Sequence, residues 1–136
     1  MFDEKFQSYL DAGYGSCILA DPEISIIVRD SLHHFDEVRY DLGWFVIMPN
    51  RVHALLKLRE GYDLSRVLQG WKGYTPKEIN RALRKVGTVW LDESFDHIVR
   101  SIESLRFFEE YIQQNPVRAG LKRGSYILGR GRSRFE

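Results

Sequence analysis

Hydrophobic side chains recur at helical spacing near the start of the chain. Four of them do so within residues 1–10, which predicts a short helix that Gly13 and Gly15 bring to an end. A second helix is expected over residues 22–35, where apolar positions again fall three or four apart. Asp21 before it is a favourable N-cap, and proline suits the first helical position. The apolar stripe of this helix is its predicted core face.

Two more helices are predicted in the second half. Residues 63–85 have helical spacing, with a weak point at Gly70 and Gly73. A capping-box pattern follows these glycines, so a separate helix could start there. Residues 101–114 form the last predicted helix, with a serine as its cap. Asn115-Pro116 should end it, because a residue that precedes proline disfavours the helical conformation.

Three segments have the composition of strands. Residues 39–48 are dense in aromatic and β-branched side chains, and residues 51–58 return after a turn at Pro49-Asn50. Residues 94–100 form the third segment. Strands and helices in this order predict an α+β fold, in which one sheet has helices against one face. The other face would be free to carry chemistry.

Composition narrows the class of protein. The chain has 136 residues, 43% of them hydrophobic and 29% charged, which suits one globular domain. None of its apolar runs approaches the length of ~20 residues that a membrane span needs. Its acidic N-terminus is unlike a secretion signal. A single cysteine, Cys17, excludes an internal disulfide framework and a multi-cysteine zinc site. We therefore expect a cytoplasmic protein.

Charge is distributed unevenly along the chain. The net charge of +1 divides into −6 over residues 1–50 and +7 over residues 51–136. This asymmetry indicates a basic surface that faces a polyanion such as nucleic acid. The alternative is a solvated surface whose charges are merely uneven. Residues 122–136 are rich in glycine and arginine and are expected to form a loose basic tail.

Arg51 and His53 are the first candidates for chemistry. They lie two residues apart on a predicted strand, so their side chains share a face. Histidine can bind a metal ion or donate to an oxygen, and arginine can hold two phosphate oxygens. An ordinary surface pair would have the same spacing, and the spacing does not separate the two interpretations.

Tyr111 is the second candidate. A tyrosine hydroxyl can act as a nucleophile when a cation activates the electrophile. Asn115 lies four residues later, on the same helical face. Tyr111 could equally be a core residue, since Phe108 and Ile112 flank it.

The remaining candidates carry a weaker signal. Residues 71–74, Trp-Lys-Gly-Tyr, combine the side chains that stack on bases and contact phosphates, but the tryptophan could equally pack inward. His33 and His34 fall late in a predicted helix and are interpreted as structural. His97 lies on a predicted strand, where it either lines the same sheet face as His53 or packs.

Residues 44–56, WFVIMPNRVHALL, resemble the signature of the REP-associated tyrosine transposases. These are single-tyrosine members of the HUH superfamily, related to insertion-sequence-200-like transposases. The resemblance extends over roughly residues 9–121. Further segments that resemble the family follow in order: 10–13, 15–17, 64–65, 71–75, 79–80, 89–90, 93–100 and 111–121.

The resemblance implies a ferredoxin-like antiparallel sheet in a single transposase-like domain over residues 1–136. It also implies a divalent ion, Mg²⁺ or Mn²⁺, and single-stranded hairpin DNA as the partner. Tyr111 would be the nucleophile, giving a 5′-phosphotyrosine and a free 3′-hydroxyl, while His53 and Asn115 would hold the metal. The expected DNA contacts are Lys72, Tyr74, Lys77, Arg81 and Arg118. No membrane partner is implied, and a homodimer stays open.

Two departures from the family pattern affect this expectation. Arg51 stands where the family has its first strand histidine, and a guanidinium cannot bind a metal ion. The family's usual first strand has no counterpart ahead of the predicted first helix, so residues 125–128 or a partner chain would fill its place. Both departures indicate a degenerate or domesticated relative, in keeping with a truncated copy.

Three functions follow from these observations. The chain could be a working or residual single-strand DNA nuclease, a nucleic-acid-binding module without catalysis, or a folded remnant that binds nothing specifically. Arg51 favours the binding module over the nuclease, because it removes a metal ligand.

Overall fold

The computed structural model describes residues 7–14, 18–83, 91–99 and 101–132. In β4 and at some positions of α2, only the backbone is described. The elements are β1 Gln7–Tyr14, a short 3₁₀ helix Ile18–Ala20, α1 Pro22–His34, β2 Tyr40–Ile47, β3 Arg51–Leu58, α2 Leu64–Leu83, β4 Leu91–Ile98, α3 Ile102–Arg118 and β5 Ile127–Arg130. Among these residues, no helix is long and apolar enough to cross a bilayer.

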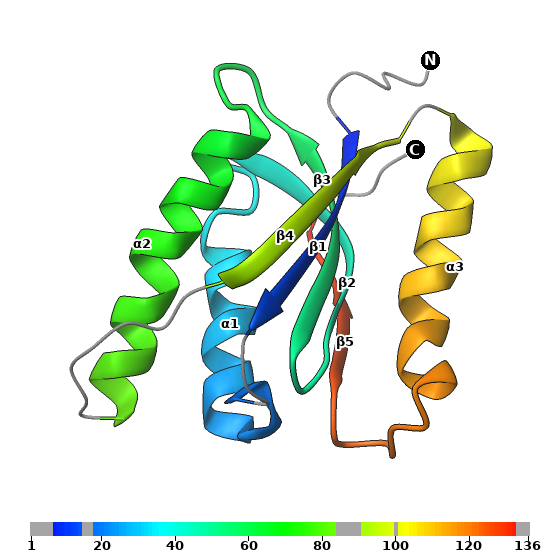
Figure 1. The fold of residues 1–136 in the computed structure, drawn as a ribbon. Helices are drawn as coiled ribbons and strands as arrows, with labels where there is room; N and C mark the ends of the chain where they lie inside the picture. Colours follow the sequence, from blue (N-terminus) through cyan, green and yellow to red (C-terminus); the bar gives the residue numbers. More distant parts are fainter. Residues whose placement is uncertain (1–6, 15–17, 84–90, 100, 133–136) are drawn as a thin grey trace.

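The described strands form one antiparallel sheet with the order β4-β1-β3-β2-β5 (Figure 1). Its first four strands have the arrangement of a ferredoxin-like sheet, in which the first and third strands lie at the centre. The predicted α+β class is therefore confirmed. The predicted hairpin is confirmed as well, since β2 and β3 are joined through the turn at Pro49-Asn50.

The expected absence of the first strand is wrong, and so is the helix predicted at the start of the chain. β1 lies between β3 and β4 and pairs with both. Its side chains alternate: Leu10 and Ala12 are fully buried on one face, while Tyr9 and Asp11 lie on the other. A spacing of three and four over so few residues does not exclude the strand period of two. Residues 1–6 lie outside the described part of the chain.

Part of the predicted loose tail also belongs to the sheet. β5 pairs with β2, and Ile127 lies opposite Ile47 at the start of the ladder. This strand forms the outer edge of the sheet, so it does not fill a central gap. Residues 133–136 of the tail lie outside the described residues.

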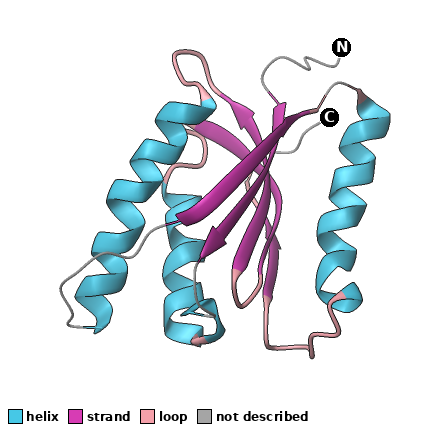
Figure 2. Cartoon of the chain, viewed as in Figure 1, coloured by secondary structure: helices cyan, strands magenta, loops and turns pink. Residues whose placement is uncertain are grey.

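Helices cover both faces of the sheet, contrary to the prediction of one covered face. α1 and α2 pack on one side and α3 packs on the other (Figures 1 and 2). The reason is visible in β3, where five consecutive residues from Val52 to Leu56 are buried, so that apolar side chains point to both faces. A strand that is apolar on both sides needs cover on both sides.

α2 is continuous where the sequence predicted a break. Gly70 lies inside it, and a Cβ there would overlap the end of the Arg39 side chain, which packs against the helix at this point. The glycine therefore serves a close approach and does not end the helix. Thr75, the expected start of a separate helix, is buried in the middle of α2.

α3 begins as predicted and ends later than predicted. The Ser104 N–H donates to the Ser101 hydroxyl over 3.0 Å, which confirms the serine cap. The helix continues through Asn115-Pro116 to Arg118, and Pro116 is buried within it. Gly120, whose φ is +72°, follows the helix in the left-handed conformation typical of a helix end.

Candidate functional site

Three side chains meet on the face of the sheet that α3 covers. Asp11 of β1 lies opposite His53 of β3, and Gly13 lies opposite Arg51. Residues directly opposite on antiparallel strands project to the same face. Arg51 and His53 therefore share a face, as their spacing predicts. Asp11 joins them, and sequence analysis did not select it.

Arg51 is held in place by Asp11. Its Nε donates to the Asp11 Oδ1 over 2.8 Å. Gly13 leaves room for this geometry, because a Cβ at that position would come within 3.1 Å of the Arg51 Nη1. The Arg51 side chain remains 29% exposed. A fixed, partly exposed positive charge thus lies at one end of this face.

His53 lies deeper, beside Tyr9. Its Nδ1 is 2.5 Å from the Tyr9 hydroxyl and 3.8 Å from the Asp11 Oδ1. Burial lowers the pKa of His53, and the nearby Arg51 charge lowers it further, while Asp11 opposes both effects. Burial also raises the pKa of the Tyr9 hydroxyl above its ordinary value. The histidine is therefore neutral at neutral pH, and the tyrosine keeps a proton that it can donate to Nδ1, which leaves the ring proton on Nε2.

The Tyr111 side chain, on α3, packs against His53 and Tyr9. Its ring centroid lies 6.2 Å from that of His53 with the planes at 90°, and 6.2 Å from that of Tyr9. Tyr9 in turn stacks on Phe108 of α3 at 4.4 Å. The structure therefore brings together His53 and Tyr111, which are distant in the sequence, and it does so through aromatic contacts between α3 and the sheet.

A small hollow adjoins Tyr111. It has a volume of about 110 Å³ and is lined by Phe107, Glu110, Tyr111 and Arg118. The Phe107 ring stacks on Tyr111 at 6.1 Å and 14°. The Arg118 guanidinium lies 5.9 Å from the centre of the Tyr111 ring. Sequence analysis did not select Phe107 or Glu110, although Phe107 lies four residues before Tyr111 and therefore on the same face of the helix.

The donor set that the structure describes around His53 does not fit a divalent ion. Arg51 cannot coordinate a metal, Asp11 is paired with Arg51, and the Nδ1 of His53 faces Tyr9. Asn115 lies one turn beyond Tyr111 on α3 and would contribute at most one neutral oxygen. Within the described part of the chain, no three His, Cys, Asp or Glu side chains are grouped as a metal site requires. Mg²⁺ and Mn²⁺ prefer several oxygen ligands, carboxylates among them.

The predicted DNA contacts are divided between the two faces of the molecule. Tyr74, Lys77 and Arg81 belong to α2, on the far side of the sheet from Tyr111, whereas Arg118 lies on α3 (Figure 1). Tyr74 stacks on His34 at 4.6 Å, and Arg81 pairs with Glu78 at 3.5 Å.

Other predicted positions have structural roles or are only partly described. Trp71 is buried, which agrees with inward packing, and His33 packs edge-on against Phe45. The His97 backbone pairs with Tyr9 across β4 and β1. The side chains of Lys72 and His97 lie outside the described set.

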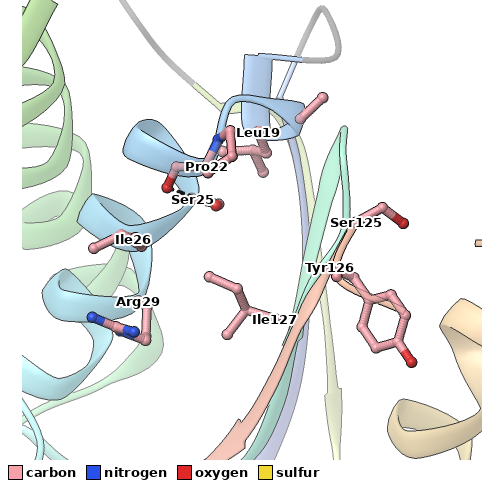
Figure 3. Close-up of a pocket in the computed structure, with 10 residues that line it drawn as sticks. Leu19, Pro22, Ser25, Ile26, Arg29, Ser125, Tyr126 and Ile127 are labelled. Carbon is pink, nitrogen blue, oxygen red and sulfur yellow. Dashed lines mark hydrogen bonds between the residues drawn. The ribbon is translucent and has the colours of Figure 1, made fainter. Parts of the chain in front are cut away.

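A second hollow lies between α1 and the start of β5 (Figure 3). It has a volume of about 220 Å³, and Ile26 and Ile127 are among its lining residues. Its one described internal hydrogen bond runs from the Ser25 hydroxyl to the Pro22 carbonyl. Arg29, which also lines it, pairs with Asp30. This hollow has no grouping of nucleophilic or acid–base side chains like that around His53.

Comparison with known proteins identifies a solved structure with a similar fold. No family model matches the chain, and no curated protein matches it. A solved structure of a REP-associated tyrosine transposase bound to a REP hairpin is similar, with a TM-score of 0.67 and 17% sequence identity. The match covers 92% of this chain and 74% of that one. The two chains share a fold.

Proposed function

We propose that this chain binds hairpin DNA on the α3 face of the sheet, with Arg51 as the phosphate contact at the centre of the site. The observation that carries the proposal is the Arg51–Asp11 pair, which lies beside His53 on the face where Tyr111 packs. The similar transposase was solved with a hairpin, which supports hairpin DNA as the class of partner.

The surroundings of Arg51 suit a phosphodiester. A guanidinium presents several donors in one plane and can bind two phosphate oxygens at once. Asp11 restrains the side chain, so less conformational entropy is lost when DNA binds. His53, which carries its proton on Nε2 when Tyr9 donates to Nδ1, is a neutral donor in the same site. Arg118 adds a second exposed cation next to Tyr111.

The same geometry predicts how the protein depends on metal. Arginine is permanently charged, so binding through Arg51 does not require Mg²⁺ or Mn²⁺. The weak donor set around His53 would hold either ion loosely at best. We therefore expect hairpin binding to persist when divalent ions are removed.

Cleavage by Tyr111 is the second candidate function, and the position of its ring beside His53 favours it. In this reaction the Tyr111 oxygen attacks phosphorus and the P–O3′ bond breaks. The products are a 5′-phosphotyrosine and a 3′-hydroxyl. The phenolic proton passes to a base, and the leaving 3′ oxygen takes up a proton. One guanidinium stabilises the developing charge less than a divalent ion would, so we expect the reaction to be slow.

Binding is tested with a fluorescently labelled DNA hairpin that has single-stranded extensions. Arg51→Ala should weaken the affinity by about tenfold, which is the usual effect of losing a hydrogen-bonded charge on phosphate. Arg59→Ala is the matched control. Arg59 follows the same strand and pairs with Asp41 at 2.8 Å, but it lies at the opposite end from Tyr111.

Two results would overturn the binding proposal. One is an equal loss of affinity in the Arg51→Ala and Arg59→Ala variants, which would indicate general charge attraction only. The other is an absence of hairpin binding by the unmodified protein at low salt. Cleavage is tested separately by covalent adduct formation on a denaturing gel, and Tyr111→Phe should abolish any adduct.

A further inference from the structure

Phe107 is a large aromatic residue of α3 that is exposed to solvent. Its side chain is 60% exposed, whereas Leu105 and Ile112 of the same helix are buried. The ring nevertheless has defined neighbours, since it stacks on Tyr111 and meets Phe108 edge-on at 5.3 Å. It is therefore a restrained aromatic surface that is open to solvent beside the candidate nucleophile.

The groups around Phe107 match the parts of a nucleotide. The hollow of about 110 Å³ is lined by Phe107, Glu110 and Arg118 together with Tyr111, and both the Phe107 ring and the Arg118 guanidinium lie near the Tyr111 ring. Aromatic rings stack on bases of any sequence, and arginine binds the backbone. A carboxylate repels phosphate but accepts hydrogen bonds from the amino group of a base.

We propose that this hollow binds one unpaired base of the DNA, stacked on Phe107, with its phosphate on Arg118 and its edge toward Glu110. The inference rests on the proposed hairpin binding and deepens it by assigning where the single-stranded flank lies. Because an ionised Glu110 can only accept hydrogen bonds, it favours adenine, cytosine or guanine, which present amino groups, over thymine, which has only its ring N3–H as a donor.

The contribution of the flank is measured as a ratio of affinities. One hairpin carries a four-nucleotide single-stranded extension of adenines, and the other is blunt. The unmodified protein should bind the extended hairpin about tenfold more tightly, within the range of one stacked base. Phe107→Leu, which keeps an apolar side chain without a ring, should remove this preference, and Phe107→Trp should keep it.

Ile102→Ala is the matched control, because Ile102 is a 51% exposed apolar residue of the same helix. It should retain the full preference for the extended hairpin. A further readout separates stacking from a general effect on the helix. 2-Aminopurine placed in the extension should lose fluorescence on binding to the unmodified protein and should lose less on binding to Phe107→Leu.

The role of Glu110 is tested with extensions of cytosine and of thymine. We expect the cytosine extension to bind about threefold more tightly, the scale of one hydrogen bond. Glu110→Gln should reduce this difference, because an amide can also donate to the carbonyl groups of thymine.

The outcomes distinguish this inference from the proposed function. If the blunt hairpin binds through Arg51 but Phe107→Leu retains the preference for the extension, base stacking at the hollow is wrong and hairpin binding stands. If neither hairpin binds to the unmodified protein, hairpin binding fails and the base site fails with it. If Ile102→Ala loses the preference as fully as Phe107→Leu, the assignment to Phe107 is wrong.

Discussion

The two faces of the sheet are built from alternate residues of the same strands, yet they differ in what those residues carry. On the face toward α1 and α2, β3 contributes Val52, Ala54 and Leu56, all with 1% exposure or less. On the face toward α3, the same strand contributes Arg51, His53 and Leu55, of which only Leu55 is apolar. The first face thus serves mainly the core, while the second combines a smaller core with a polar site.

The comparison shows how a small domain can carry a polar site without losing its core. Polar groups under α3 are paired with one another, as in the Arg51–Asp11 ion pair and the His53–Tyr9 hydrogen bond. Buried polar groups destabilise a fold much less when they have partners. Substitutions on the α1 and α2 face should therefore mainly lower stability, whereas substitutions on the α3 face should mainly affect DNA binding.

The largest expected effect on stability is on the α1 and α2 face. Leu56→Ala should lower the free energy of unfolding by about 3 kcal/mol, because it leaves a cavity in a closely packed core. Urea unfolding followed by circular dichroism measures this. By comparison, Arg51→Ala should cost less than about 1 kcal/mol, since a partly exposed ion pair contributes little. Equal losses from the two substitutions would contradict the division between the faces.

Asp11 acts on both Arg51 and His53 in the polar site. Asp11→Asn keeps the size of the side chain but removes the charge that restrains Arg51 and opposes the fall in the His53 pKa. Hairpin affinity should change by less than about threefold, less than the loss in Arg51→Ala, because the lost restraint on Arg51 weakens binding while the lost carboxylate no longer repels phosphate. The pKa of His53, followed by NMR titration of its ring protons, should fall further below its ordinary value. A rise in that pKa would show that Asp11 does not act on the histidine as described.

The stability of the polar face should depend on pH. Burial lowers the pKa of His53 in the folded protein, so the unfolded chain binds the proton more tightly. The stabilisation is therefore complete above the unfolded pKa of about 6.5 and is lost as the pH falls through the folded pKa. Urea unfolding at several values between pH 8 and pH 5 should show a decline that is smaller in His53→Gln. A decline of the same size in both proteins would assign the pH dependence to other groups.

The smallest expected effect is on the outer surface of α2. Lys77→Ala should change hairpin affinity by less than about twofold, because this exposed cation lies across the sheet from Tyr111 and is screened by salt. Arg118→Ala is the comparison on the α3 side and should have a larger effect. If Lys77→Ala weakens binding more than Arg118→Ala, the DNA lies along α2 and the choice of face is wrong.

Much of the framework follows from local patterns in the sequence. The Asp21 cap, the hairpin of β2 and β3 and the Ser101 cap were all predictable, because each depends on neighbouring residues. β1 was missed because its central position depends on pairing with strands distant in the sequence. The close approach of Arg39 to Gly70 in α2 likewise involves a residue of another segment.

The candidate site was predictable only in part for the same reason. The spacing of Arg51 and His53 places them on one face, and their side chains do share it. Asp11 and Tyr9 complete the site through strand pairing, which no motif near β3 indicates. The residues predicted to contact DNA on α2 and on α3 are of similar types, so the sequence does not distinguish them. The three-dimensional structure shows that the sheet separates the two helices.

In the proposed function, Arg51 binds the DNA phosphate by itself, so hairpin binding should not need a divalent ion. It is tested most directly by measuring the affinity for one labelled hairpin in EDTA and in Mn²⁺, for the unmodified protein and for Arg51→His. We predict that the unmodified protein binds equally well in both conditions. In Arg51→His, the new imidazole lies beside His53 and a released Asp11, so affinity should rise when Mn²⁺ is added. A loss of about tenfold or more in EDTA for the unmodified protein would contradict the claim.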